Sequence, residues 1–205
     1  MSALEFDAET HTYRLNGEVI PSVTEILAPL TVGKYPPSGV VAQAAARGTR
    51  IHELCALHDE DGLPDEFEGD LVPYVQAWSD FCRDYSPTWL YIEHPMCAGT
   101  IIAGTVDRIG MIDGKFTTVD IKTAQSLDRP AKLALACQLY GYQKLAKHNA
   151  LYRYSDPEDS FGVQLLKDGG YRIYRRADIE KKYQFNSYEL FQNLLDIYDV
   201  VKGRT

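Results

Sequence analysis

The dipeptide Asp113-Gly114, between two strand-like runs at 101–112 and 116–123, constrains the fold of this chain more than any other feature. Asp-Gly favours a two-residue turn whose twist matches that of the flanking strands in a β-hairpin. With these two residues forming the turn, the register of the two strands is fixed. That register places Asp107 directly opposite Asp120, with Cβ atoms about 4.5–5.5 Å apart.

Two aspartates facing each other across a sheet repel, so the predicted pair needs compensation. Lys122 lies two residues beyond Asp120 and therefore shares its strand face. A divalent cation, which prefers carboxylate oxygens as ligands, would also compensate the charge. The alternative is that Asp107 and Asp120 simply face water on an exposed sheet.

Periodicity predicts the remaining elements. Expected strands are 12–15, 18–20, 89–97, 101–112, 116–123, 151–154, 161–167 and 171–175, and expected helices are 40–58, 71–86, 130–147 and 178–201. A capping box at Ser22 and Glu25 adds a short helix after the Asn16-Gly17 hairpin. This order predicts an α/β fold, with a mixed central β-sheet flanked by helices on both faces. Nothing marks a convincing boundary, so residues 1–205 are expected to form a single domain.

Composition narrows the classes of partner. The 205 residues carry a net charge of −8, which argues against a protein that coats nucleic acid by bulk charge. The charge is uneven, since residues 1–100 hold 5 Lys/Arg against 16 Asp/Glu, and residues 101–205 hold 16 against 13. A local basic track therefore remains possible. The sequence lacks a membrane-span pattern and a secretory signal, so a cytoplasmic protein with no membrane partner is expected.

The spacing Asp107-x12-Asp120-x-Lys122, preceded by Glu93-His94-Pro95, resembles the PD-(D/E)xK nuclease superfamily, in its RecB-like and bacteriophage-type exonuclease branch. Four further segments resemble motifs of that branch, in the family order. They are Gly48-Thr49-Arg50-Ile51-His52, Gly104-Thr105-Val106-Asp107, Asp120-Ile121-Lys122-Thr123 and Gln138-Leu139-Tyr140-Gly141-Tyr142. The resemblance implies a restriction-endonuclease-like core.

The resemblance also implies roles for five residues. Asp107 and Asp120 would bind Mg²⁺ or Mn²⁺, with Glu93 and His52 as further ligands. Lys122 would orient the attacking water and stabilise charge on the phosphate. Some members of the branch carry an iron–sulfur cluster on cysteines near the C-terminus. Because no cysteine follows position 137 here, no iron–sulfur cluster is expected.

For two of these proposed ligands, Glu93 and His52, the sequence also allows a role other than metal binding. If 98–100 is a three-residue loop, Glu93 pairs with Thr105 and shares a face with Asp107, whereas a two-residue loop places Glu93 on the opposite face. His52 lies in an apolar helical stripe, which is also the usual place of a core histidine.

Candidate nucleic-acid contacts are Gln138, Tyr142, Arg50, Arg129 and Thr123. Gln138 and Tyr142 are four residues apart on one helix face, where the alternative is ordinary packing. Arg129 lies near a helix start, a favourable place for phosphate, and Lys132 follows it. A late basic cluster of Arg172, Arg175, Arg176, Lys181 and Lys182 either tracks DNA or is merely solvated.

The expected function is a metal-dependent deoxyribonuclease, and within that class an exonuclease acting on DNA ends in recombination, repair or phage replication. DNA is the expected substrate, and a homo-oligomer and a single-strand annealing or recombination partner are possible. The alternatives are a structure-specific or nonspecific endonuclease, and a nuclease fold that binds nucleic acid without cutting it.

Overall fold

The structure is a computed structural model that describes residues 4–7, 10–31, 38–151 and 159–204. Its elements, in chain order, are β1 (Leu4–Asp7), β2 (Thr12–Leu15), β3 (Glu18–Ile20), α1 (Val23–Leu27), a 3-10 turn (Ala28–Leu30), α2 (Ser38–Asp59), α3 (Val72–Tyr85), β4 (Thr88–Ala98), β5 (Ile102–Ile112), β6 (Lys115–Lys122), α4 (Arg129–His148), β7 (Asp159–Leu165), β8 (Tyr171–Arg175), α5 (Arg176–Tyr183) and α6 (Ser187–Lys202).

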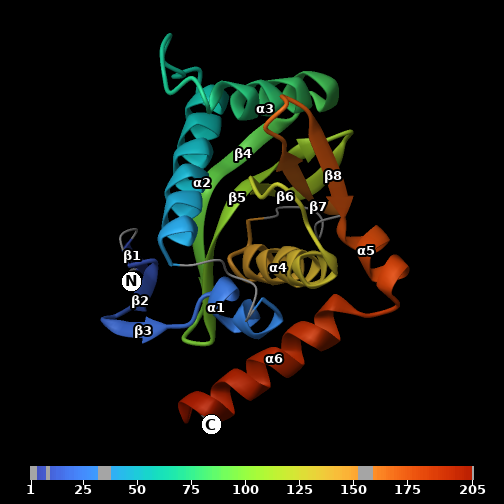
Figure 1. The fold of residues 1–205 in the computed structure, drawn as a ribbon. Helices are drawn as coiled ribbons and strands as arrows, with labels where there is room; N and C mark the ends of the chain where they lie inside the picture. The colour runs from blue at the N-terminus through green and yellow to red at the C-terminus, as the bar shows by residue number, and fades with distance from the viewer. Residues whose placement is uncertain (1–3, 8–9, 32–37, 152–158, 205) are drawn as a thin grey trace.

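The central sheet has the strand order β4-β5-β6-β7-β8 (Figure 1). Strands β4, β5 and β6 form an antiparallel meander, β7 runs parallel to β6, and β8 returns antiparallel to β7. Helix α4 lies between β6 and β7 in the chain, as expected because parallel neighbours need a crossover connection. The predicted mixed sheet in an α/β fold is thus confirmed.

Helices cover both faces of this sheet, also as predicted (Figure 1). On one face, α2 and α3 pack against the sheet through a core that includes Leu54, Trp78 and Phe161. On the other face, α1, α4 and α6 enclose a second core that includes Val106 and Phe191. Strands β4 to β6 therefore carry side chains into both layers, and the candidate site lies where these strands meet α2 and α4.

The N-terminal strands form a separate three-stranded sheet of order β1-β2-β3. The predicted hairpin is confirmed, with Asn16 and Gly17 both at positive φ, as the tight turn requires. Strand β1 was missed, because four residues before a turn give too little alternation to detect. A hydrogen bond of 2.8 Å between the Tyr13 hydroxyl and Thr105 Oγ1 ties this sheet to β5.

The predicted helix over 178–201 is wrong in extent. The chain forms two helices, α5 and α6, because Gln184 adopts a left-handed φ of 53° and Asn186 caps the new helix through the amides of Tyr188 and Glu189. Most of the expected strand 151–154 lies outside the described residues. Within the described residues, no helix is long and apolar enough to cross a membrane.

Candidate functional site

Three side chains from three elements converge where α2 crosses the sheet. His52 Nδ1 of α2 lies 3.6 Å from Glu93 Oε1 of β4 and 3.6 Å from Asp107 Oδ2 of β5. One potential ligand atom from each lies within 4.8 Å of the others. The sequence predicted all three as metal ligands, and the structure brings them together.

Asp107 lies in β5 next to the point where the β5–β6 ladder ends. The predicted register holds from Ile112–Lys115 to Arg108–Val119, but the ladder does not include Asp107 and Asp120. Instead, Asp107 Oδ2 accepts a hydrogen bond of 2.6 Å from the backbone amide of Ile121. The ladder therefore ends one pair short of the predicted Asp107–Asp120 pair, which stays a prediction, and the Asp107 carboxylate accepts from the Ile121 amide where the next ladder hydrogen bonds would lie.

Glu93 is displaced from its predicted partner by two positions. The β4–β5 register pairs Ala98 with Ile102 and His94 with Val106, so the loop is 99–101 and Glu93 falls opposite Asp107 instead of Thr105. A shift of two leaves the strand face unchanged. Glu93 also has a φ of 45°, an unfavourable value for a residue with a Cβ, and such strain is typical of functional sites.

Asp120 belongs to a second, adjoining group. Its Oδ2 lies 2.8 Å from Lys122 Nζ, which donates a hydrogen bond of 2.8 Å to Gln138 Oε1 of α4. The Gln138 amide in turn donates to the Tyr142 hydroxyl at 2.8 Å. Tyr142 is only 4% exposed, so it holds the Gln138 amide in place, and its predicted role as a direct nucleic-acid contact does not fit this position.

The two groups influence each other electrostatically. Burial, together with the nearby charge of Asp107, raises the pKa of Asp120 to about 6, against the attraction of Lys122. Burial also raises the pKa of Asp107. Burial opposes the charge on His52, but Asp107 and Glu93 outweigh it and raise the His52 pKa to about 9. The carboxylates of the site thus carry more negative charge than the nearby side-chain cations neutralise.

The sequence did not predict a buried ion pair between Arg108 and Asp59, which also holds Glu93 in position through Arg108. Arg108, with a completely buried side chain, donates from Nε to Asp59 Oδ2 at 2.6 Å and from Nη1 to Glu93 Oε1 at 3.0 Å. Trp78 Nε1 donates to the other Asp59 oxygen at 2.9 Å. The signal available in the sequence was an arginine directly after Asp107 in a strand that is otherwise apolar except for Thr105.

The remaining candidates lie around this centre. Arg50 is bound to Glu53 and Glu68, which neutralise its charge. Thr123 packs against α2, where a Cβ on Gly48 would lie 3.3 Å from Thr123 Oγ1, so the glycine permits the close approach. Arg129 lies at the start of α4, over the ring of Tyr183.

The donor set of His52, Glu93 and Asp107 fits a divalent cation such as Mg²⁺ or Mn²⁺. It offers one imidazole nitrogen and carboxylate oxygens, which are ligands for hard and borderline cations. Among the described residues, only one oxygen of each carboxylate receives a hydrogen bond, so lone pairs remain for a metal.

A second possible ligand set, His58, Asp59 and Cys82, fits a cation poorly. The Asp59 carboxylate already accepts from Arg108 and Trp78. Burial and the nearby Asp59 charge hold the pKa of the Cys82 thiol well above its usual range, which disfavours the thiolate that a metal requires.

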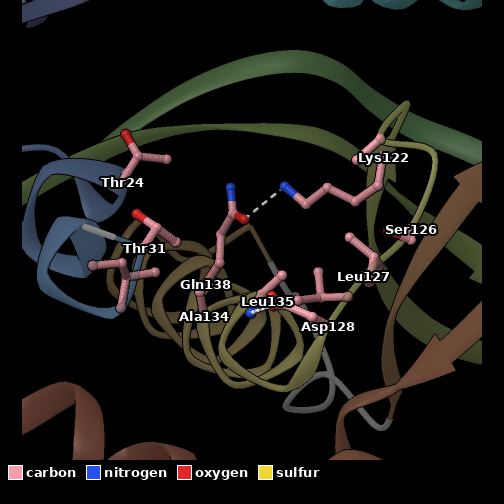
Figure 2. A pocket seen from close by; sticks show the side chains of 12 residues that line it. Thr24, Thr31, Lys122, Ser126, Leu127, Asp128, Ala134, Leu135 and Gln138 are labelled. Carbon is pink, nitrogen blue, oxygen red and sulfur yellow. Dashed lines mark hydrogen bonds between the residues drawn. The ribbon is translucent and has the colours of Figure 1, made fainter. Parts of the chain in front are cut away.

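A cavity of about 530 Å³ opens beside Lys122. Figure 2 shows Lys122 and Gln138 extending toward each other across it, with Thr24 and Thr31 on one side and Leu127 and Asp128 on the other. Its lining is Thr24, Leu27, Thr31, Lys122, Ala124, Ser126, Leu127, Asp128, Ala131, Ala134, Leu135 and Gln138. The cavity gives a ligand access to the Lys122 ammonium.

No protein-family model matches the chain, and no curated protein sequence matches it. Among solved structures, one described as "Crystal structure of SSO0001" is 16% identical, covers 82% of this chain and 75% of that chain, and superposes with a TM-score of 0.32. A likeness at that level bears on neither fold nor function, which rest here on the chain's own residues.

Proposed function

We propose that the protein is a divalent-metal-dependent nuclease of the PD-(D/E)xK type. The observation that carries the proposal is the convergence of His52, Glu93 and Asp107 beside the Asp120–Lys122 pair. Lys122 lines the cavity of about 530 Å³, and His52 and Glu93 line a separate hollow of about 460 Å³. Three potential ligands and one cation, both open to a ligand, suit hydrolysis of a phosphodiester, whose transition state carries dispersed negative charge.

In this proposal, His52, Glu93 and Asp107 hold Mg²⁺ or Mn²⁺, and Asp120 lies close enough to contribute charge. The bound cation would supply Lewis acidity and neutralise phosphate charge. Lys122 donates hydrogen bonds to the phosphate or to the attacking water, and Gln138 with Tyr142 fixes the direction of its ammonium. A non-cleaving nuclease fold is the weaker alternative, because it needs neither the converging ligands nor the oriented lysine.

The resemblance to bacteriophage-type exonucleases favours an exonuclease acting on DNA ends. Digestion of end-labelled linear DNA and covalently closed circular DNA with Mg²⁺ or Mn²⁺ tests both levels of the proposal. Linear DNA alone should be degraded. Equal cutting of circles would instead support an endonuclease, and no cutting of either substrate by the metal-loaded protein would overturn the nuclease proposal.

A matched pair of variants links any cutting to this site. Asp107→Asn removes a proposed ligand and should abolish cleavage. Asp113→Asn makes the same change in the turn of the same hairpin, where Asn-Gly is as favourable as Asp-Gly, and should cleave normally.

A further inference from the structure

Three cations without carboxylate partners among the described residues lie at the start of α4 and on α5. Arg129 and Lys132 come from the first turn of α4, and Lys182 comes from α5. Among the described residues, none of the three lies within salt-bridge distance of an acid, although the neighbouring Arg175 and Arg176 pair with Asp159 and Glu180. We call these three cations, with Tyr174 and Tyr183, the α4–α5 surface.

Aromatic rings hold these cations in place of acids. The Arg129 guanidinium lies 5.4 Å from the centre of the Tyr183 ring, and Lys182 Nζ lies 5.6 Å from the same ring. Lys132 Nζ lies 5.1 Å from the centre of the Tyr174 ring. A cation on a ring is positioned but keeps its full charge, whereas one paired with a carboxylate is neutralised. The arrangement therefore leaves three positive charges available to an anion.

Hydrogen bonds connect the α4–α5 surface to the strand end that carries Lys122. The Tyr174 hydroxyl donates to Gln164 Oε1 at 3.1 Å, and the Gln164 amide donates to the Ala124 carbonyl at 2.6 Å. Gln164 is completely buried and lies beside Lys122 in the β6–β7 ladder. The ring under Lys132 is thus fixed relative to the candidate catalytic lysine.

The first turn of α4 separates the surface from the cavity beside Lys122 and contributes residues to both. Asp128 and Ala131 line that cavity, and Arg129 and Lys132 are the next residues along α4. On the far side of this first turn, Lys132 and Lys182 line a smaller hollow of about 110 Å³. One acid, Asp178, lines the hollow too, so cations outnumber acids there.

We propose that the α4–α5 surface binds the phosphodiester backbone of the nucleic-acid strand that enters the cavity beside Lys122. The inference rests on the proposed nuclease function and extends it by naming where the strand runs beyond the cleavage site. Uncompensated cations beside an anion-processing cavity are the expected footprint of backbone binding, even on a chain with a net charge of −8.

The test measures binding separately from cleavage. A fluorescein-labelled single-stranded oligodeoxynucleotide is titrated with protein in Ca²⁺, at a series of NaCl concentrations, and gels check that the probe stays intact. The variant is Arg129→Gln/Lys132→Gln/Lys182→Gln. Its control, Lys115→Gln/Lys167→Gln/Lys202→Gln, removes the same charge from exposed lysines elsewhere.

The slope of log affinity against log salt should fall in magnitude by about 2 in the first variant, because three phosphate contacts on a single strand each contribute about 0.7. The control should keep the wild-type slope. An unchanged slope in the first variant, an equal fall in the control, or no binding by the wild type would overturn the proposal. If the slope falls in the first variant and not in the control, but the wild-type protein never cuts DNA, the result supports this binding surface and rejects the nuclease function.

Discussion

Arg108 Nε donates a hydrogen bond of 2.6 Å to Asp59 Oδ2, and both side chains are almost completely buried. The pair joins β5 to the last residue of α2, the helix that carries His52. Arg108 also reaches Glu93, so it links the α2–α3 core to one proposed metal ligand. Both the stability of the fold and the position of the Glu93 carboxylate therefore depend on Arg108.

Arg108→Met should destabilise the protein by about 3–5 kcal/mol, because it leaves the Asp59 carboxylate buried without its cation. Adding Asp59→Asn should recover much of that loss, since the uncompensated charge disappears. Urea denaturation measures both. Arg83→Met, at an exposed arginine of α3 that also pairs with acids, should change stability by less than about 1 kcal/mol. A similarly small loss in Arg108→Met would show that the buried pair is not required.

Tyr142→Phe should slow cleavage while preserving the fold. The ring stays, and it packs so tightly that a Cβ on Gly104 would lie 3.0 Å from Tyr142 Cε1. Only the hydroxyl that holds the Gln138 amide is lost. We expect kcat to fall about tenfold or more as Lys122 loses its fixed direction, with KM little changed. Tyr140→Phe on the same helix is the control, and unchanged kcat with a lower melting temperature would favour simple packing.

Stability of the metal-free protein should fall as pH rises above about 6.5. The pKa of His52 is raised from 6.5 to about 9 in the folded protein, so its proton stabilises the fold fully below the unfolded value and is lost through about pH 9. Melting temperatures in EDTA across this window measure the effect. His52→Asn should flatten the curve, whereas substitution of the exposed His148 should not.

Divalent metal should reverse this trend. Because a ligating histidine must be deprotonated, Mn²⁺ should raise the melting temperature more at about pH 8 than at about pH 6. A metal effect independent of pH, or one retained by His52→Asn, would argue against His52 as a ligand.

The sequence predicted the parts of the site that depend on local pattern. The Asp113-Gly114 turn sets the β5–β6 register as far as Arg108, because the turn residues and the alternation of the strands agree. The ladder ends at Arg108, and at Asp107 a side-chain hydrogen bond from the Ile121 amide takes its place. Such a replacement is a tertiary event, which period-two alternation does not encode.

The residues that support the site, such as Asp59, could not be predicted from the sequence for a different reason. Asp59 ends α2 in a stretch rich in acids, and only the folded chain distinguishes it by burying it against Arg108 and Trp78. The α4–α5 surface likewise joins residues about fifty positions apart, so the sequence showed the cations but not the rings beneath them.

Lys122→Ala tests the centre of the proposed mechanism. Cleavage should fall by at least about 100-fold, the scale for losing a positioned electrostatic or acid–base group. Metal binding should survive, because His52, Glu93 and Asp107 remain. The matched control is Lys115→Ala, at the exposed start of the same strand, which should cleave at the wild-type rate.

The same substitution should also destabilise the metal-free protein above about pH 6. Asp120 is buried, its folded pKa is already raised to about 6, and Lys122 is the cation that opposes this rise. Without Lys122 the folded state must bury an unpaired carboxylate, so stability falls as Asp120 ionises. Lys122→Ala/Asp120→Asn should therefore regain stability without regaining cleavage. Near wild-type cleavage by Lys122→Ala would place the active site elsewhere, whatever its melting temperature.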